Sequence, residues 1–176
     1  HCHIQFKGYD ADREEVLTLC KEKNVWMNAV GTQYSTSKMA VELAEKNSSI
    51  FATIGLHPIQ EHEVEVVEEG SSFTTRGEVF DMESYRSLAK NPKVIAIGET
   101  GFDRFHVPKD ASLSSVMKVQ YDTFISHALL ASELGLPMVF HVREAHEDLR
   151  SALVDLRQKG VSVRGVVHCF SGTSED

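Results

Sequence analysis

The chain has 176 residues, of which 41% are hydrophobic and 25% are charged. This composition suits a protein with a packed core and excludes the disordered and membrane-embedded classes. No apolar run approaches the roughly 18 residues of a membrane-spanning helix, so we expect no membrane partner. The net charge of −8 argues against binding of nucleic acid through a broad basic surface. It is compatible with a phosphodiester substrate, because bound metal cations would be the largest local charges in an active site.

The three cysteines, Cys2, Cys20 and Cys169, form no CxxC motif and no even-numbered disulfide framework. This usage is typical of a reducing compartment, and we expect a cytoplasmic protein. The first residue is His1 rather than Met, so the lack of a signal peptide carries little weight.

Helical and strand-like segments alternate along the chain, which is typical of an α/β fold with a parallel sheet. Apolar periodicity, caps and breakers predict helices over residues 10–23, 37–46, 81–90, 112–134 and 144–159. They predict strands over residues 25–30, 50–56, 94–99, 137–142 and 161–167. With the residues up to Ile4 as a further strand, the chain holds about six βα units. A TIM (β/α)8 barrel spends about 31 residues on each unit, so we expect an incomplete barrel.

One segment, residues 60–80, interrupts this alternation. It contains the acidic and then flexible piece EHEVEVVEEGSS, and we expect a solvated insertion or loop. A lid over the active site is the functional alternative. A lid this acidic would repel long nucleic acids and favour short ends or small substrates.

The segment VIAIGETGFD, Val94 to Asp103, combines the pattern of a buried strand with a candidate functional residue. Its apolar run is typical of a strand that is buried on both faces and leads into a carboxylate, Glu99. A buried carboxylate costs several kcal/mol unless it is paired or bound to a metal, so packing does not explain Glu99. The flanking Gly98 and Gly101 permit a sharp turn and a close approach of other groups to the backbone.

Four histidines extend this pattern. His1 and His3 project from the same face of an extended segment, about 6.6 Å apart, and could chelate one cation. His141 and His168 each follow an apolar run at the predicted carboxyl end of a strand, the side on which barrel enzymes keep their active sites. A core histidine bonded to a backbone carbonyl is the alternative for either residue alone. Together with Glu99 they form a ligand set that suits Zn, Mn or Mg.

The segments HCHI, GLHP, IGETGFDR, ELGLPMVFHVREA and VVHCFSG resemble the TatD family of metal-dependent deoxyribonucleases. The resemblance covers the whole chain except the acidic insertion. It implies a TIM barrel of the amidohydrolase type with two divalent metal ions, Mg, Mn or Zn, bridged by Glu99. It implies that His1 and His3 bind one metal and that His141 and His168 bind the other. In that family an aspartate from a later strand completes the site, and the sequence ends before a residue that would match it.

Three further residues lie on the expected rim. Arg143, two residues after His141, suits a phosphate oxygen pair, with a salt bridge to Glu144 or Asp148 as the alternative. His57 in GLHP is expected either to contact a substrate phosphate or to hydrogen-bond a metal ligand. Asp103 is expected to bond a ligand histidine or to fix its own loop.

The predicted helix over residues 112–134 differs from the family pattern at one position. Gln120 and Phe124 match the family's long helix, whereas His127 stands where Gln is usual. Because His127 falls on the apolar face, we expect it in the interior or between helices.

The sequence therefore predicts a single metal-dependent hydrolase domain over residues 1–176, with C-terminal units missing. We expect it to cleave phosphodiester bonds of DNA as a 3′–5′ exonuclease, with Glu99 at the catalytic centre and a metal-activated water as nucleophile. We expect a monomer. Two alternatives stay open: an ester hydrolase such as a D-aminoacyl-tRNA deacylase, and a truncated module that binds metal without turnover.

Overall fold

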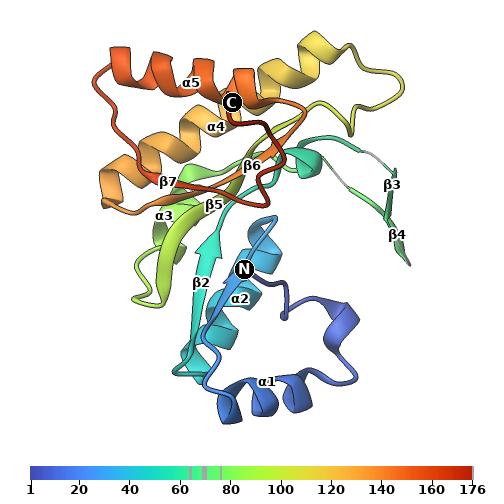
Figure 1. Cartoon of the computed structure of the whole chain (residues 1–176), viewed down its shortest axis with the longest axis vertical. Helices are drawn as coiled ribbons and strands as arrows, with labels where there is room; N and C mark the ends of the chain where they lie inside the picture. The colour runs from blue at the N-terminus through green and yellow to red at the C-terminus, as the bar shows by residue number, and fades with distance from the viewer. Residues whose placement is uncertain (64, 69–70, 76, 176) are drawn as a thin grey trace.

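A computed structural model describes residues 1–63, 65–68, 71–75 and 77–175 of the chain (Figure 1). Five strands form one sheet in the order β1-β2-β5-β6-β7, and every neighbouring pair is parallel. Their bounds are β1 Met27–Val30, β2 Ile50–Ile54, β5 Val94–Asp103, β6 Met138–Arg143 and β7 Gly165–Val167. The α/β fold with a parallel sheet is therefore confirmed.

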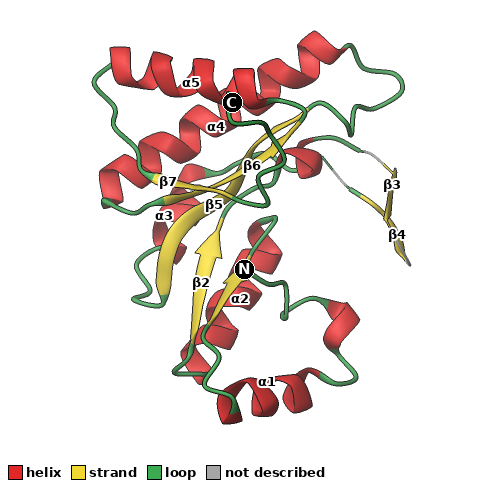
Figure 2. Ribbon diagram, in the orientation of Figure 1, coloured by secondary structure: helices red, strands yellow, loops and turns green. Residues whose placement is uncertain are grey.

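Helices connect these strands in chain order (Figure 2). They are α1 Arg13–Glu22, α2 Tyr34–Lys46, α3 Met82–Leu88, α4 Leu113–Leu134 and α5 His146–Gln158, with short 3-10 helices at Lys7–Tyr9 and Pro58–Glu61. The side chains of Asp81 and Ser112 cap the amino ends of α3 and α4, and Gly135 ends α4 in a left-handed conformation. The predicted helices over residues 81–90 and 112–134 begin at these two capping residues, and the second ends just before Gly135.

The first expected strand is reduced to one bridge. Cys2 pairs in parallel with Ala29 of β1, accepting a hydrogen bond from Val30 N–H and donating one to Asn28 O. His1 and His3 flank this bridge and are thereby placed beside the sheet. Among the described residues the sheet does not close on itself, as expected for an incomplete barrel.

The core lies between the sheet and its helices. Ala44 of α2, Phe124 of α4 and Leu156 of α5 are buried in one cluster with strand residues such as Ile54 and Ile97. This burial is the main source of stability, at about 25 cal/mol for each Å² of apolar surface removed from water. The cluster fixes the strand directions, and with them the positions of the side chains at the strand ends.

The segment 60–80, expected as a loop, contains an antiparallel hairpin, β3 Glu65–Glu68 with β4 Ser71–Thr74 (Figure 2). Of the described helices, none is long and apolar enough to cross a membrane.

Candidate metal centre

Glu99 lies in the middle of β5, at a register shift against β6 between Gly98 and Thr100. The sequence places it at the strand end, and this is wrong because pairing with β6 continues to Asp103. Gly98 and Gly101 have φ angles of 138° and 151°, and an added Cβ would meet a β6 carbonyl oxygen at 2.4 and 2.0 Å respectively. Only glycine permits this approach, so the two glycines bring β6 and its His141 against the carboxylate.

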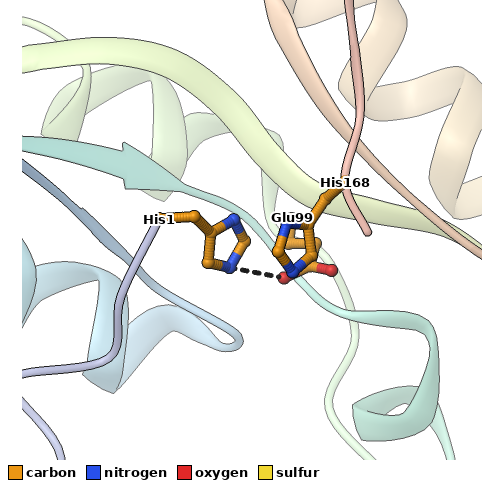
Figure 3. A group of neighbouring side chains, drawn as sticks. All are labelled: His1, Glu99 and His168. Atoms are coloured by element: carbon orange, nitrogen blue, oxygen red, sulfur yellow. Dashed lines mark ion pairs between the residues drawn. The ribbon is translucent and has the colours of Figure 1, made fainter. Parts of the chain in front are cut away.

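The two carboxylate oxygens of Glu99 face different histidines. Oε2 lies 3.3 Å from Nε2 of His1, and Oε1 lies 3.1 Å from Nδ1 of His141. The ring of His168 stacks on that of His1 with centroids 3.6 Å apart (Figure 3). His57 places its Nε2 3.9 Å from Oε1. Glu99 is thereby shared by two groups that could each hold a metal ion, His1–Glu99–His168 and His57–Glu99–His141.

This grouping differs from the pairing that the family resemblance implies. His168 lies beside His1 rather than beside His141. His3 belongs to neither group of described residues: its Nδ1 lies 2.8 Å from Val30 O. An Nδ1–H donor to this carbonyl leaves a lone pair on Nε2, which is the usual state of a histidine that binds a metal. The role of His3 as a ligand therefore stays a prediction.

Asp103 holds His141 from the other side of its ring. The Nε2 atom of His141 lies 3.1 Å from Oδ2 of Asp103, which is fully buried. The same carboxylate accepts hydrogen bonds from the backbone N–H groups of Phe105 and His106, both at 2.8 Å, and lies 2.9 Å from Nδ1 of His106. A carboxylate behind a ligand imidazole fixes its tautomer and orientation. Both expectations for Asp103 thus match contacts in the structure.

The contacts in this cluster keep the carboxyl groups of Glu99 and Asp103 ionised. Burial raises the pKa of Glu99, but the hydrogen bond of His141 and the nearby histidines outweigh it and hold the pKa below its usual value. Burial lowers the pKa of His141, and its contacts with Asp103 and Glu99 reverse this and raise it to about 8. The pKa of Asp103 is likewise depressed by His141 and His106, despite burial. Both carboxylates are ionised, the form that binds cations.

His57 has a different hydrogen-bonding state. Its Nδ1 accepts a hydrogen bond from Ile59 N–H at 3.2 Å, so the neutral ring carries its proton on Nε2. Burial, followed by the neighbouring His141, lowers its pKa to about 3, and the ring is neutral. The Nε2 atom of His57 lies 3.0 Å from Nδ1 of His141 and carries a proton rather than a free lone pair. In this state His57 does not offer a ligand atom, and the group His57–Glu99–His141 contributes Glu99 and His141 as candidate ligands.

Arg143 makes neither of the salt bridges considered for it. Its guanidinium carbon lies over the Phe105 ring, 4.0 Å from the centroid, and among the described residues it forms no ion pair. Asp148 is instead bound by Arg104, with N–O distances of 2.7 and 2.8 Å.

Sequence reasoning missed two residues at this site, His106 and Phe105. The spacing of Asp103 and His106 across a turn is the one available signal for the first, and Asp-x-x-His is common without any function. An open hollow of about 350 Å³ lies elsewhere, at the amino ends of β5, β6 and β7, with a mainly apolar lining that includes Ile95 and Val166. It has no part in the Glu99 cluster.

The donor set fits divalent metal ions. Imidazole nitrogens and carboxylate oxygens around a shared, buried, ionised Glu99 are ligands that Zn, Mn and related cations accept. Fold and site together define an α/β protein with a candidate histidine–carboxylate metal centre on its parallel sheet.

Comparison with known proteins narrows this class. The family described as TatD related DNase matches residues 1–176, and the chain belongs to this family. It is 33% identical over 177 residues to the uncharacterized metal-dependent hydrolase YabD of Bacillus subtilis, covering 99% of this chain and 61% of that protein. It is 29% identical over 169 residues to the 3′-5′ ssDNA/RNA exonuclease TatD of Escherichia coli, covering 94% and 56%.

Solved structures give the same result. The TatD homologue YjjV of Escherichia coli superposes with a TM-score of 0.71 at 25% identity, over 98% of this chain and 60% of that one. An uncharacterized amidohydrolase of Saccharomyces cerevisiae superposes with a TM-score of 0.62 at 19% identity, over 93% and 56%. These neighbours are TIM barrels. The chain spans about 60% of the length of the relatives it matches.

Proposed function

We propose that this chain forms the metal centre of a hydrolase that cleaves phosphodiester bonds of single-stranded DNA from the 3′ end with two divalent cations, Mg, Mn or Zn. The observation that carries the proposal is the position of Glu99, whose two oxygens face two separate groups of histidines. Relatives named as 3′-5′ ssDNA/RNA exonucleases support the choice of substrate.

The residues that would hold the cations are His1, Glu99, His141 and His168, with His3 as the further ligand that the sequence predicts. When bound, divalent cations lower the pKa of water and stabilise the charge on a leaving oxygen. A carboxylate shared by both groups would keep the two cations close together.

Three further residues have other roles in this proposal: Asp103 orients a ligand histidine, and His57 and Arg143 contact the substrate. Asp103 holds His141 with Nδ1 directed at Glu99. We assign the Nε2–H of His57 to a substrate phosphate oxygen, because its Nδ1 already accepts a hydrogen bond and the ring is not arranged as a ligand. We assign Arg143 to a phosphate as well, since its charge is not neutralised by a described carboxylate.

The nearest rival is the hydrolysis of an ester such as a D-aminoacyl-tRNA, in which water attacks a carbonyl carbon. The two activities separate in one assay of a 5′-labelled single-stranded DNA and a charged tRNA, each with Mn²⁺ or Mg²⁺. Shortening of the DNA from its 3′ end supports the proposal. Turnover of the tRNA ester with intact DNA would contradict it, and turnover of neither substrate would favour a module that binds metal without catalysis.

A further inference from the structure

Phe105 is a large aromatic side chain that the fold leaves 55% exposed beside the candidate metal centre. It follows β5 directly after Arg104, and β5 ends at Asp103, which pairs in register with Arg143 at the end of β6. A chain of contacts links the ring to the centre through His106, Asp103 and His141. Its position is therefore set by the same carboxylate that holds a candidate ligand.

The ring is held in place without being covered. Phe105 N–H donates to Oδ1 of Asp103 at 2.8 Å, which fixes the backbone where the ring begins. The Arg143 guanidinium lies over the ring, 4.0 Å from its centroid. The His106 ring meets it edge-on, with centroids 4.9 Å apart and an interplanar angle of 80°. A ring fixed on these sides but more than half exposed is preorganised to stack on a flat ligand.

The charge of the protein bears on what that ligand is. With a net charge of −8, the chain has little long-range attraction for a polyanion, so affinity for nucleic acid must come from short-range contacts. Stacking of a base on an aromatic ring is such a contact and tolerates every base, because each has a π face. The guanidinium of Arg143 on the same ring adds a cation that is free of described carboxylates.

We propose that Phe105 and Arg143 form a nucleotide subsite, in which the Phe105 ring stacks on a base of single-stranded DNA or RNA next to the bond that is cleaved. This inference rests on the proposed function and adds Phe105 as the residue that stacks on a base of the substrate. It assigns no base preference, because a phenyl ring offers no hydrogen bond to a base edge.

The test measures binding and hydrolysis separately, on two single-stranded DNA oligonucleotides that differ at one position. One is fully normal, and the other carries a tetrahydrofuran abasic residue next to the 3′-terminal nucleotide. The variants are Phe105→Ala and Phe105→Trp. The matched control is Trp26→Ala, because Trp26 is 65% exposed, stacks on Phe51 and precedes β1 at the opposite end of the strands.

We expect Phe105→Ala to weaken binding of the normal oligonucleotide about tenfold, measured by fluorescence anisotropy with Ca²⁺, and to raise KM by a similar factor with kcat within about twofold, measured with Mn²⁺. Phe105→Trp should restore both values. The abasic oligonucleotide should bind the wild type and Phe105→Ala equally, and Trp26→Ala should match the wild type throughout.

Three results would overturn the subsite: unchanged binding of the normal oligonucleotide by Phe105→Ala, an equal loss on both oligonucleotides, or no measurable binding by the wild type. The proposed function fails in a different way. Wild-type protein that binds through Phe105 but hydrolyses neither oligonucleotide would contradict the hydrolase proposal and still support the subsite.

Discussion

Two regions of the molecule each surround a histidine with hydrogen-bond partners, and those partners shift the pKa of the imidazole in opposite directions. His127 in α4 is fully buried; its Nδ1 donates to Thr123 O at 2.8 Å and its Nε2 accepts from Leu56 N–H at 3.0 Å. His141 in β6 instead contacts two carboxylates, those of Glu99 and Asp103. Burial lowers the pKa of His127 to about 4, whereas the carboxylates raise that of His141 to about 8.

The difference shows how hydrogen-bond partners set the charge of a histidine: backbone groups leave His127 neutral, whereas two carboxylates raise the pKa of His141. The backbone partners of His127 match the neutral ring and leave no atom for a ligand. The partners of His141 are anions, and the direction of its Nδ1 toward Glu99 suits the binding of a cation. Four predictions test this contrast.

The largest effect is expected for Glu99→Gln, which keeps the shape of the side chain and removes the shared charge. Hydrolysis of single-stranded DNA should fall by about a thousandfold or more, because metal ions contribute several kcal/mol to transition-state stabilisation and about 4 kcal/mol corresponds to a thousandfold. Single-turnover kinetics at saturating Mn²⁺ would measure it. Activity within tenfold of the wild type would remove Glu99 from the catalytic centre.

The second prediction concerns acid stability and His127. Since its pKa is about 4 in the fold and 6.5 in the unfolded chain, the neutral ring contributes stability above pH 6.5 that is lost as the pH falls toward 4. His127→Gln keeps one donor and one acceptor but does not titrate. From pH 7 to pH 4 the wild type should lose about 3 kcal/mol more than the variant in metal-free urea unfolding. Parallel pH profiles for the two proteins would contradict the structural assignment.

The third prediction concerns Asp103→Asn. An amide in this position no longer offers a charged oxygen to His141 and His106, which both contact Oδ2. Affinity for Mn²⁺ should fall by about 10- to 100-fold, the usual cost of losing a partner behind a ligand histidine. Titration calorimetry would measure it, with Asp148→Asn as the control because that carboxylate binds the exposed Arg104. Equal Mn²⁺ affinities in the two variants would mean that Asp103 only holds its own loop in place.

The smallest effect is expected for Arg104→Ala. Its ion pair with Asp148 is partly exposed to solvent, so unfolding stability should fall by less than about 1 kcal/mol. Mn²⁺ affinity should stay within about twofold of the wild type. A larger change in that affinity would mean that this rim ion pair orders the metal centre.

Much of this contrast could be read from the sequence. The apolar run from Val94 predicts the first part of β5, and apolar periodicity together with Gly135 predicts the bounds of α4, because these are local signals. The interior place of His127 follows from its position on the apolar face of α4 and is confirmed. The sequence also predicts that histidines gather near Glu99, since carboxyl ends of parallel strands lie on one side of a sheet.

Other features could not be predicted, because they depend on three-dimensional geometry that the spacing of residues in the sequence does not determine. The register shift at Gly98 places Glu99 inside the paired part of β5. The stacking of His168 on His1 depends on how far β7 and the first bridge extend. The contact between Arg143 and Phe105 depends on the end of β6 meeting the loop that follows β5. The hairpin within residues 60–80 was missed because its composition is that of a solvated loop.

The central claim, that Glu99 is the carboxylate shared by two metal sites, is tested most directly by metal content. Bound Mn²⁺ would be measured by equilibrium dialysis and elemental analysis in the wild type, Glu99→Gln and Glu61→Gln. Glu61 is the matched control because it is a buried glutamate outside both ligand groups, and burial raises its pKa to about 8, so that Gln resembles its protonated form. We predict wild-type binding in Glu61→Gln and at least a tenfold loss of affinity in Glu99→Gln. Wild-type metal content in Glu99→Gln would contradict the account.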